Sequence, residues 1–539
     1  MFRNLLLVGV MVAAAMLAGC GGKGTGRAPC PAGKLCLEYG NTTEPVTLDP
    51  HKATGTWETR LLGDVFLGLT TDDAEGKAIP GLATSWETST DGLTWTFHLR
   101  DAVWSDGVPI TADDFVFSLR RIMDPKTASE YASLLYFIVG AQPVNEGKAP
   151  LESLGVRAID AHTLEIRLVH PAPYLPELAK HQTMFAVPKH AVEKYGDAWV
   201  RPENFVSSGP YVVKSWRLGD YVLVEKNARF YDAAHVCFDQ IRYYPTVDAV
   251  SAERRIKRGE IDVNTDMQSN RIAFLKKTMP GYIHVNTYLG VAYIAFNTSA
   301  KNGVAAFRDV RVRQALDMAV DRDFITAKLL RGGQLSAYTF TPPGLANYTS
   351  PKPPAWAAWS LERRQAEARR LLALAGYGPG HPLKFTLKHR NTPDPMLFMP
   401  AVQADWKAIG VEAQLAQEET QIAYADYRAR AFQAADASWV ADYNDPMTFL
   451  YLMGSSTGAQ NYSDYSNSAY DALLAKADAE PDAVKRAGYL AQAESMMLED
   501  APVIPVYFYV NKNMVSPRIT GWHDNLVDWH RARFLCVRP

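Results

Sequence analysis

Several features that would assign a function directly are scarce or absent in this sequence. The charge is nearly balanced, with 56 basic and 58 acidic residues and a formal net charge of -2. No basic stripe interrupts this balance, so the cationic surface that a phosphate backbone requires is missing and we expect no nucleic-acid partner. The sequence also lacks a Gly-Lys-Ser/Thr phosphate loop and an H-E-x-x-H helix, which excludes the sites that those motifs build.

Candidates for a metal or catalytic site are equally few. Histidines such as His51, His98 and His389 are isolated and have no second ligand at helical spacing, so we expect no metal and no cofactor. The stretch 454–458 has the spelling of a nucleophile elbow, G-x-S-x-G, with Ser456 at the centre. That elbow needs a strand, a turn and a helix, and the polar run that follows is not helical. We interpret it as a loop and expect no enzyme; a surface hydrolase is the alternative.

The amino terminus has the pattern of an export signal. Arg3 precedes an apolar run from Leu5 to Met16, and Leu17-Ala18-Gly19-Cys20 follows. This ending resembles the bacterial lipobox, which predicts a lipoprotein signal peptide over 1–19 and a lipid on Cys20. Acyl chains there would anchor the mature chain to a membrane surface. Residues 20–36 would then form a flexible tether rich in Gly, Lys and Pro.

Cysteine is scarce, with five residues in the whole chain. Beyond Cys20 an even number remains, namely Cys30, Cys36, Cys237 and Cys536. An even number in an exported chain favours disulfides, and no second close pair or histidine at ligand spacing supports zinc. Three pairings are possible. The spacing of Cys30 and Cys36 allows a local loop, and we predict Cys30–Cys36 and Cys237–Cys536.

The rest of the chain has a composition typical of a globular protein, with strand-like and helix-like patterns in alternation. With 539 residues and 47% hydrophobic residues, it is long enough for several domains. Strand-like alternation occurs at Trp95, Phe97 and Leu99, and a helix start with a capping-box-like pattern lies at 111–114. The sequence pattern changes near Gly290, and from there on strand-like and helix-like segments alternate. The pattern predicts a mixed α/β architecture.

One polar and aromatic stretch lies between alanine-rich segments. From Ser438 to Pro446 it contains Trp439, Asp442 and Tyr443. Asn, Asp and Pro gather at turns because their side chains bond local backbone and Pro fixes φ, so a turn is the simplest interpretation. The alternative is a buried polar contact beside aromatic surfaces, with Asp442 as a ligand carboxylate.

A series of longer motifs carries a resemblance to a known family. They are Leu48-Asp49-Pro50-His51-Lys52, Trp95 to Arg100 followed by Trp104-Ser105-Asp106-Gly107, Asp124-Pro125 with Thr127 to Ser129 and Tyr131 to Ser133, Asp309 to Arg313, Tyr338 with Thr341-Pro342-Pro343, and Trp439 to Pro446. In this order the motifs resemble those of the oligopeptide/dipeptide-binding solute-binding proteins of bacterial ABC importers.

The resemblance implies a two-lobe periplasmic-binding-protein fold of α/β type, with two hinge strands and an extra domain on the first lobe. Carried onto this chain, the first lobe would combine 37–66, 189–289 and 511–539. The extra domain would be 67–188, and the second lobe would be 290–510. Cys237 and Cys536 would then share one lobe, which supports their pairing.

The resemblance also implies roles for individual residues around an extended peptide that is held by main-chain hydrogen bonds. Asp442 matches the aspartate that pairs with the ligand α-ammonium. Trp439 and Tyr131 match pocket aromatics, Tyr509 a tyrosine near the second hinge, Gly55 and Thr56 the segment that pairs with peptide backbone, and Arg428 a basic residue that receives a ligand carboxylate.

One departure from the family pattern concerns Asp436. Three residues before Trp439, such binders commonly carry a basic residue for a tripeptide carboxylate, and here an acid stands instead. We expect Asp436 to favour a cationic group on the ligand or to disfavour the carboxylate of a short peptide.

The function implied is an extracytoplasmic lipoprotein, in the periplasm or cell envelope, that captures oligopeptides between two lobes and delivers them to the permease of an ABC importer. We expect a monomer. The alternatives are a binder of murein peptide or another non-standard peptide-like ligand, the hydrolase named above, and a structural or signalling lipoprotein.

Overall fold

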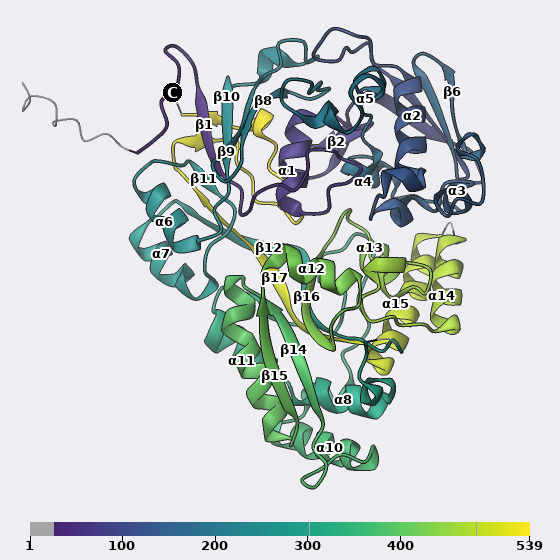
Figure 1. Ribbon diagram of the computed structural model, residues 1–539, viewed down its shortest axis with the longest axis vertical. Helices are drawn as coiled ribbons and strands as arrows, with labels where there is room; N and C mark the ends of the chain where they lie inside the picture. Colours follow the sequence, from purple (N-terminus) through teal and green to yellow (C-terminus); the bar gives the residue numbers. More distant parts are fainter. Residues whose placement is uncertain (1–25, 301, 481, 539) are drawn as a thin grey trace, which may run out of the picture.

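Two lobes share one continuous sheet in the computed structural model, which describes residues 26–300, 302–480 and 482–538. The sheet has 11 strands in the order β15-β14-β16-β12-β17-β11-β1-β10-β9-β8, with β13 (Leu335–Ser336) paired to β17 off this path. Its centre consists of two long antiparallel strands, β12 (Ile283–Phe296) and β17 (Val503–Val515). These strands run from one lobe into the other and form the hinge (Figure 1).

The first lobe contains one half of this sheet. Its strands are β1 (Cys36–Gly40), β8 (Tyr211–Arg217), β9 (Tyr221–Lys226), β10 (Gln240–Tyr244) and β11 (Val263–Asn264). Its helices include α1 (Thr56–Val65), α5 (Lys189–Tyr195), α6 (Ala249–Lys257) and α7 (Ile272–Thr278). All five residues of β1 are buried, as expected for a parallel strand with neighbours on both sides and cover on both faces.

An extra domain with its own sheet adjoins the first lobe. The strands β4 (Ala83–Thr88), β5 (Thr94–Leu99), β7 (Thr163–Arg167) and β6 (Val156–Asp160) are antiparallel in this order. In β5 the predicted alternation is confirmed, because Trp95, Phe97 and Leu99 are buried and their neighbours are half-buried. Helix α2 (Ala112–Met123) begins at the predicted capping box, in which the Thr111 amide donates to Asp114 Oδ2 at 2.9 Å.

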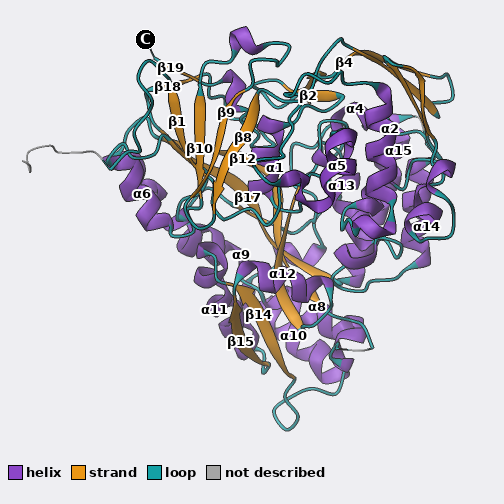
Figure 2. Ribbon diagram, turned by 45° about the horizontal axis from the view of Figure 1, so that its top comes forward, coloured by secondary structure: helices purple, strands orange, loops and turns teal. Residues whose placement is uncertain are grey.

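The second lobe packs helices on the remaining strands. Its strands are β14 (Lys384–Arg390), β15 (Glu412–Glu418) and β16 (Ala434–Val440), and its larger helices are α8 (Val310–Ala319), α10 (Leu361–Leu374), α11 (Pro393–Ala408), α12 (Thr420–Arg428), α14 (Ser468–Asp478) and α15 (Ala483–Asp500). Rings of Phe296, Phe307, Phe385 and Trp406 pack in its core, separately from the first-lobe core. Figure 2 shows β14, β15, α10 and α11 below the first lobe.

The structure contains both predicted disulfides, Cys30–Cys36 and Cys237–Cys536. The second bond ties the carboxyl-terminal segment, which ends in β18 (Ile519–Thr520) and β19 (Cys536–Val537), to the first lobe. Cys20 and the predicted signal peptide lie outside the described residues. Within the described part of the chain, no helix is long and apolar enough to cross a membrane.

Candidate functional site

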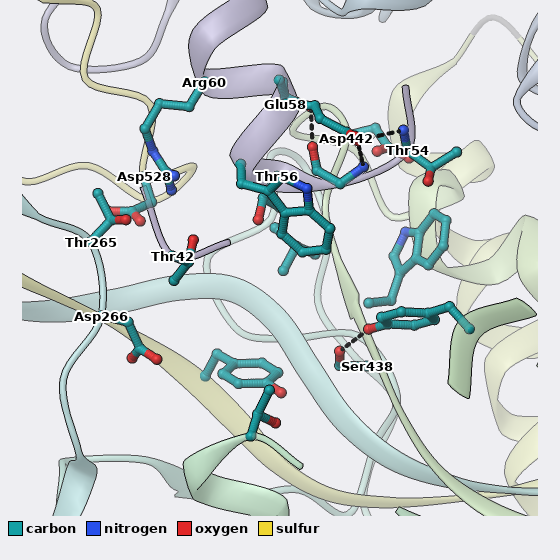
Figure 3. Close-up of a pocket in the computed structure, with 18 of the residues that line it drawn as sticks. Thr42, Thr54, Thr56, Glu58, Arg60, Thr265, Asp266, Ser438, Asp442 and Asp528 are labelled. Carbon is teal, nitrogen blue, oxygen red and sulfur yellow. Dashed lines mark hydrogen bonds between the residues drawn. The ribbon is translucent and has the colours of Figure 1, made fainter. Parts of the chain in front are cut away.

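A cavity of about 360 Å³ lies between the two lobes, beside the hinge strands. It is lined from the first lobe by the start of α1, from the second lobe by α12 and the end of β16, and from the hinge by β17 (Figure 3). Seven of the predicted ligand-binding residues line it, namely Gly55, Thr56, Tyr131, Arg428, Trp439, Asp442 and Tyr509. The eighth, Asp436, does not.

Asp442 presents a buried carboxyl group to this cavity. It follows the end of β16 and is 7% exposed, and its Oδ2 accepts a hydrogen bond from Thr448 Oγ1 at 3.4 Å. Burial raises the pKa of the carboxyl to about 8. His181 Nε2 lies 3.6 Å from Oδ1, but burial and the charge of Arg531 lower the pKa of His181 to about 3, so this imidazole is neutral.

No lysine or arginine of the described residues pairs with Asp442. An ionised carboxylate in such a place is costly unless a cation arrives to pair with it. The site can therefore receive an ammonium group from a ligand.

Aromatic rings form the wall next to Asp442. The rings of Tyr131 and Trp439 lie 6.3 Å apart, and Trp439 meets Tyr451 edge-on at 6.0 Å. The indole nitrogen of Trp439 is buried and has no partner in the described residues. On the hinge, Tyr509 packs edge-on against Tyr288 and Tyr507. This wall suits apolar parts of a ligand, while its few polar atoms remain available for hydrogen bonds.

Glu58 stabilises the backbone at the first-lobe edge of the cavity. Its carboxylate accepts hydrogen bonds from the backbone amides of Val46, Thr54 and Gly55 at 2.6, 3.1 and 2.8 Å. A side chain at Gly55 would collide with the ring of Trp57, so the close approach requires glycine here. Thr56, the first residue of α1, is exposed and lines the cavity.

Arg428 is paired across the cleft. Its Nε lies 3.1 Å from Oε2 of Glu130, which belongs to the extra domain. The predicted carboxylate receiver is therefore engaged by a protein acid in this arrangement, and the pair joins the two sides of the cavity.

Asp436 lies behind the cavity wall and is 1% exposed. Its Oδ2 accepts from Nε and Nη2 of Arg390 at 2.8 and 2.6 Å, and its Oδ1 accepts from the Arg390 amide at 2.7 Å. We predicted that Asp436 itself would meet a ligand. The structure differs, because the carboxylate is occupied by Arg390, and it is the guanidinium that lines the cavity.

Sequence reasoning missed a second charged group in the cavity, around Lys512 on β17. Its ammonium lies 3.2 Å from Asp266 Oδ1 and 3.1 Å from Asp394 Oδ2. The hydroxyl of Ser269 donates to Asp394 Oδ1 at 2.9 Å. Ser269 belongs to the first lobe and Asp394 to the second, so this cluster bridges the lobes on the hinge side.

One signal in the sequence could have found Arg390 and Asp394. Both follow the alternating apolar residues Leu383, Phe385 and Leu387, a pattern that is typical of a strand. In open α/β sheets, ligand sites gather beyond the carboxyl ends of strands, so polar residues just after a predicted strand are candidates.

The loop that contains Ser456 does not have the geometry of a nucleophile elbow. Residues 454–458 connect two short 3-10 segments, Tyr451–Met453 and Gly458–Gln460, and no strand leads into them. Ser456 is exposed and lies outside the cavity lining.

A two-lobed α/β fold with a cavity between its lobes is the architecture of a solute-binding protein, and comparisons with known proteins agree. Residues 77–461 match the family model described as "Bacterial extracellular solute-binding proteins, family 5 Middle". The chain is 38% identical over 532 residues to the periplasmic oligopeptide-binding protein OppA of Escherichia coli, which covers 96% of this chain and 95% of the relative. The chain belongs to the family 5 bacterial extracellular solute-binding proteins.

The lobes of this chain are closed. Its fold matches the structure of the E. coli murein tripeptide-binding protein MppA with a TM-score of 0.89 at 36% identity, covering 94% of this chain and 99% of the other. Against the unliganded open form of MppA the TM-score is 0.70 at 36% identity, with 94% and 98% coverage. The identity is the same and the coverage nearly the same in both comparisons, so the difference reflects the arrangement of the lobes.

Proposed function

We propose that this chain captures oligopeptides in the cleft and that Asp442 pairs with the ligand α-ammonium. The observation that carries this is the buried carboxyl of Asp442, which has no lysine or arginine partner among the described residues. A peptide amino terminus is a cation that can reach it from the cavity. Charge-assisted hydrogen bonds of this type contribute about 1.5 to 3 kcal/mol.

Both lobes take part in this proposal. The backbone at Gly55 and Thr56 pairs with the peptide main chain, while Trp439, Tyr131 and Tyr509 surround its side chains. A ligand that contacts both lobes favours the closed state only through its differential affinity for that state. The protein catalyses no reaction, in line with relatives that are named as binding proteins.

The cellular role follows from the relatives and the sequence. OppA of E. coli is named a periplasmic oligopeptide-binding protein, which supports a periplasmic or envelope location and delivery to the permease of an ABC importer. We place the first lobe at 37–66, 189–289 and 511–539, the extra domain at 67–188 and the second lobe at 290–510. Cys20 carries the lipid anchor of a monomer; membrane fractionation of a Cys20→Ala variant checks the anchor.

Calorimetric titration with a tripeptide and its N-acetylated form tests the ammonium pairing. We expect acetylation to weaken binding by roughly 10- to 100-fold, and Asp442→Asn to weaken binding of the free peptide by a similar factor. The Asp101→Asn variant makes the same chemical change on a fully exposed carboxylate far from the cleft and should bind like the original protein. Equal affinity of the free and acetylated peptides would rule out Asp442 as the anchor.

A further inference from the structure

Arg390 places a guanidinium group in the cavity wall and is held there from behind. It ends β14, and its side chain is 8% exposed while that of Asp436 is 1% exposed. Asp436 Oδ2 accepts two guanidinium N–H groups, and Oδ1 accepts the Arg390 amide and, at 3.2 Å, the Tyr427 hydroxyl. The carboxylate of Asp436 is therefore saturated, and the guanidinium cannot rotate without breaking this set of bonds.

The outer edge of Arg390 meets two hydroxyl groups that line the cavity. Nη1 donates to Tyr424 Oη at 2.7 Å and to Ser438 Oγ at 3.0 Å. The two hydroxyls lie 3.1 Å from each other, with Ser438 on β16 facing the cavity (Figure 3). All three side chains thus belong to the second lobe, and their mutual bonds do not involve the first lobe.

Because Arg390 is the donor in these bonds, the hydroxyl protons of Tyr424 and Ser438 must be donated elsewhere. A guanidinium has five N–H donors and no acceptor, so both hydroxyls must accept from Arg390. One of them can then donate its proton to the other, which leaves one hydroxyl proton without a partner inside the group. Four of the five guanidinium N–H groups are used within the described residues, so one N–H of Nη2 is also left. The group offers donors to the cavity and needs an acceptor.

We propose that Arg390, Tyr424 and Ser438 form a subsite for the terminal carboxylate of a short peptide, with Asp436 as the positioning residue that orients it. A carboxylate is the acceptor that suits such donors best, because bonds from a guanidinium to a charged oxygen are about twice as strong as neutral ones. Asp436 also neutralises Arg390 while the subsite is empty, so the buried guanidinium is not left unpaired.

The spacing along the chain limits the peptide length. Ser438 and Asp442 are four residues apart, so their Cα atoms lie at most about 14 Å from each other. A peptide of three or four residues in extended form covers a similar distance. This inference rests on the proposed function, because Asp442 defines the other end of the ligand. A longer peptide would bring a neutral main-chain carbonyl to the same donors.

The experiment compares a tripeptide that has a free carboxylate with the same peptide as its carboxyl-terminal amide, by calorimetric titration. We expect the original protein to bind the acid roughly tenfold more tightly than the amide. Tyr424→Phe should reduce this ratio to about twofold. Asp436→Asn removes the charge that neutralises Arg390, so it should raise the ratio, whereas a general loss of structure would weaken both ligands equally.

Tyr465→Phe is the matched control. It removes a tyrosine hydroxyl from the same lobe, where that hydroxyl donates to Asp500 Oδ2 at 2.6 Å and does not line the cavity, so the ratio should stay near tenfold. Equal affinities for acid and amide in the original protein, or an unchanged ratio in Tyr424→Phe, would overturn the subsite. The two proposals fail separately, because loss of binding in Asp442→Asn should affect acid and amide alike whether or not the subsite exists.

Discussion

Asp442 holds a potential negative charge where burial opposes it. The nearest histidine is neutral, and Thr448 supplies a single hydroxyl at 3.4 Å. When the cleft is closed and empty, ionisation of Asp442 is therefore unfavourable. The ammonium group of a ligand would remove this cost by pairing with the carboxylate. The group that we propose as the ligand anchor should therefore also make the ligand-free protein sensitive to pH.

The pKa of Asp442 gives the sign of this sensitivity. It rises from 3.8 to about 8 on folding, so the native state binds the proton more tightly than the unfolded chain. Stability of the ligand-free protein should therefore fall as pH rises from about 4 to about 8 and then level off. Asp442→Asn removes this loss, so we expect the variant to be more stable than the original protein at pH 8 by roughly 1 to 3 kcal/mol, and nearly equal at pH 4.

Thermal unfolding of both proteins at pH 4, 6 and 8 without peptide measures this difference. The upper end of this stability range is smaller than the pKa shift alone would give at about 1.4 kcal/mol per unit. Opening of the lobes lets water reach the carboxylate and reduces the cost of ionisation. Saturating peptide should abolish the advantage of the variant. An advantage that does not change between pH 4 and pH 8 would contradict a buried, unpaired Asp442.

The residue type of Asp436 does not show which group its carboxylate contacts. Its acid character was apparent from the sequence, but its partner Arg390 is 46 residues away and meets it only because β14 pairs with β16. The expectation that an acid at this position faces the ligand assumed that the side chain was free. Pairing of neighbouring strands decided which of the two charges reaches the cavity.

At the scale of elements, local patterns predicted well. Helix α10 begins after Ser360, whose hydroxyl accepts from the Arg363 amide, and it ends just before Gly376 at φ +89°, which agrees with the capping preferences of serine and glycine. In a sequence, a proline such as Pro505 is typical of an edge strand or a strand start, because it lacks an amide donor. It lies near the start of β17, but this strand is interior, and the register of β12 shifts next to Pro505. A local irregularity accommodates the missing amide donor there.

The hinge side of the cleft contains hydrogen bonds that join the two lobes. Ser269 on the first lobe donates to Asp394 at the start of α11, and it accepts from Gln334 at 2.7 Å and from Lys512 at 3.1 Å. Ser269 and Asp394 are 125 residues apart, and no local pattern links them. The bonds do not involve a ligand, so they add to the stability of the closed state in any complex.

We expect Asp394→Asn to accelerate peptide dissociation by about three- to tenfold while association changes little, because one charged acceptor of the bridge is lost after closure. Stopped-flow fluorescence measures both rates. Glu412→Gln is a suitable control, since Glu412 pairs with Lys384 on the exposed surface of the same lobe. An unchanged dissociation rate would show that the bridge does not hold the lobes together.

At the scale of the whole molecule, the described chain is a closed two-lobed body whose carboxyl terminus returns to the first lobe. Residues 519–537 bring Asp528 and Trp529 to the cavity lining, and Arg531 binds Asp72 Oδ2 at 2.9 Å. The fold class and both disulfides could be predicted from motifs and cysteine arithmetic. The lobe contacts could not, because they depend on how surfaces far apart in the sequence meet.

The two disulfides should differ in their effect on global stability. Cys237–Cys536 closes a loop with a sequence separation of 299, whereas Cys30–Cys36 closes one of 6. In the chain-entropy account, a cross-link removes more freedom from the unfolded chain when its loop is longer, which gives roughly 5 to 6 kcal/mol for the long loop and about 2 kcal/mol for the short one. We therefore expect the double variant Cys237→Ser/Cys536→Ser to lose clearly more stability than Cys30→Ser/Cys36→Ser.

Denaturant unfolding of the two double variants, compared with the original protein, measures this difference, and each variant is the control for the other. The longer bond also fixes the segment that carries Asp528 and Trp529, so its loss should weaken peptide binding by a few-fold, while loss of the short bond should leave affinity unchanged. Equal destabilisation by both variants would mean that the unfolded chain is already restricted over the long loop, and that the bond acts through the folded first lobe instead.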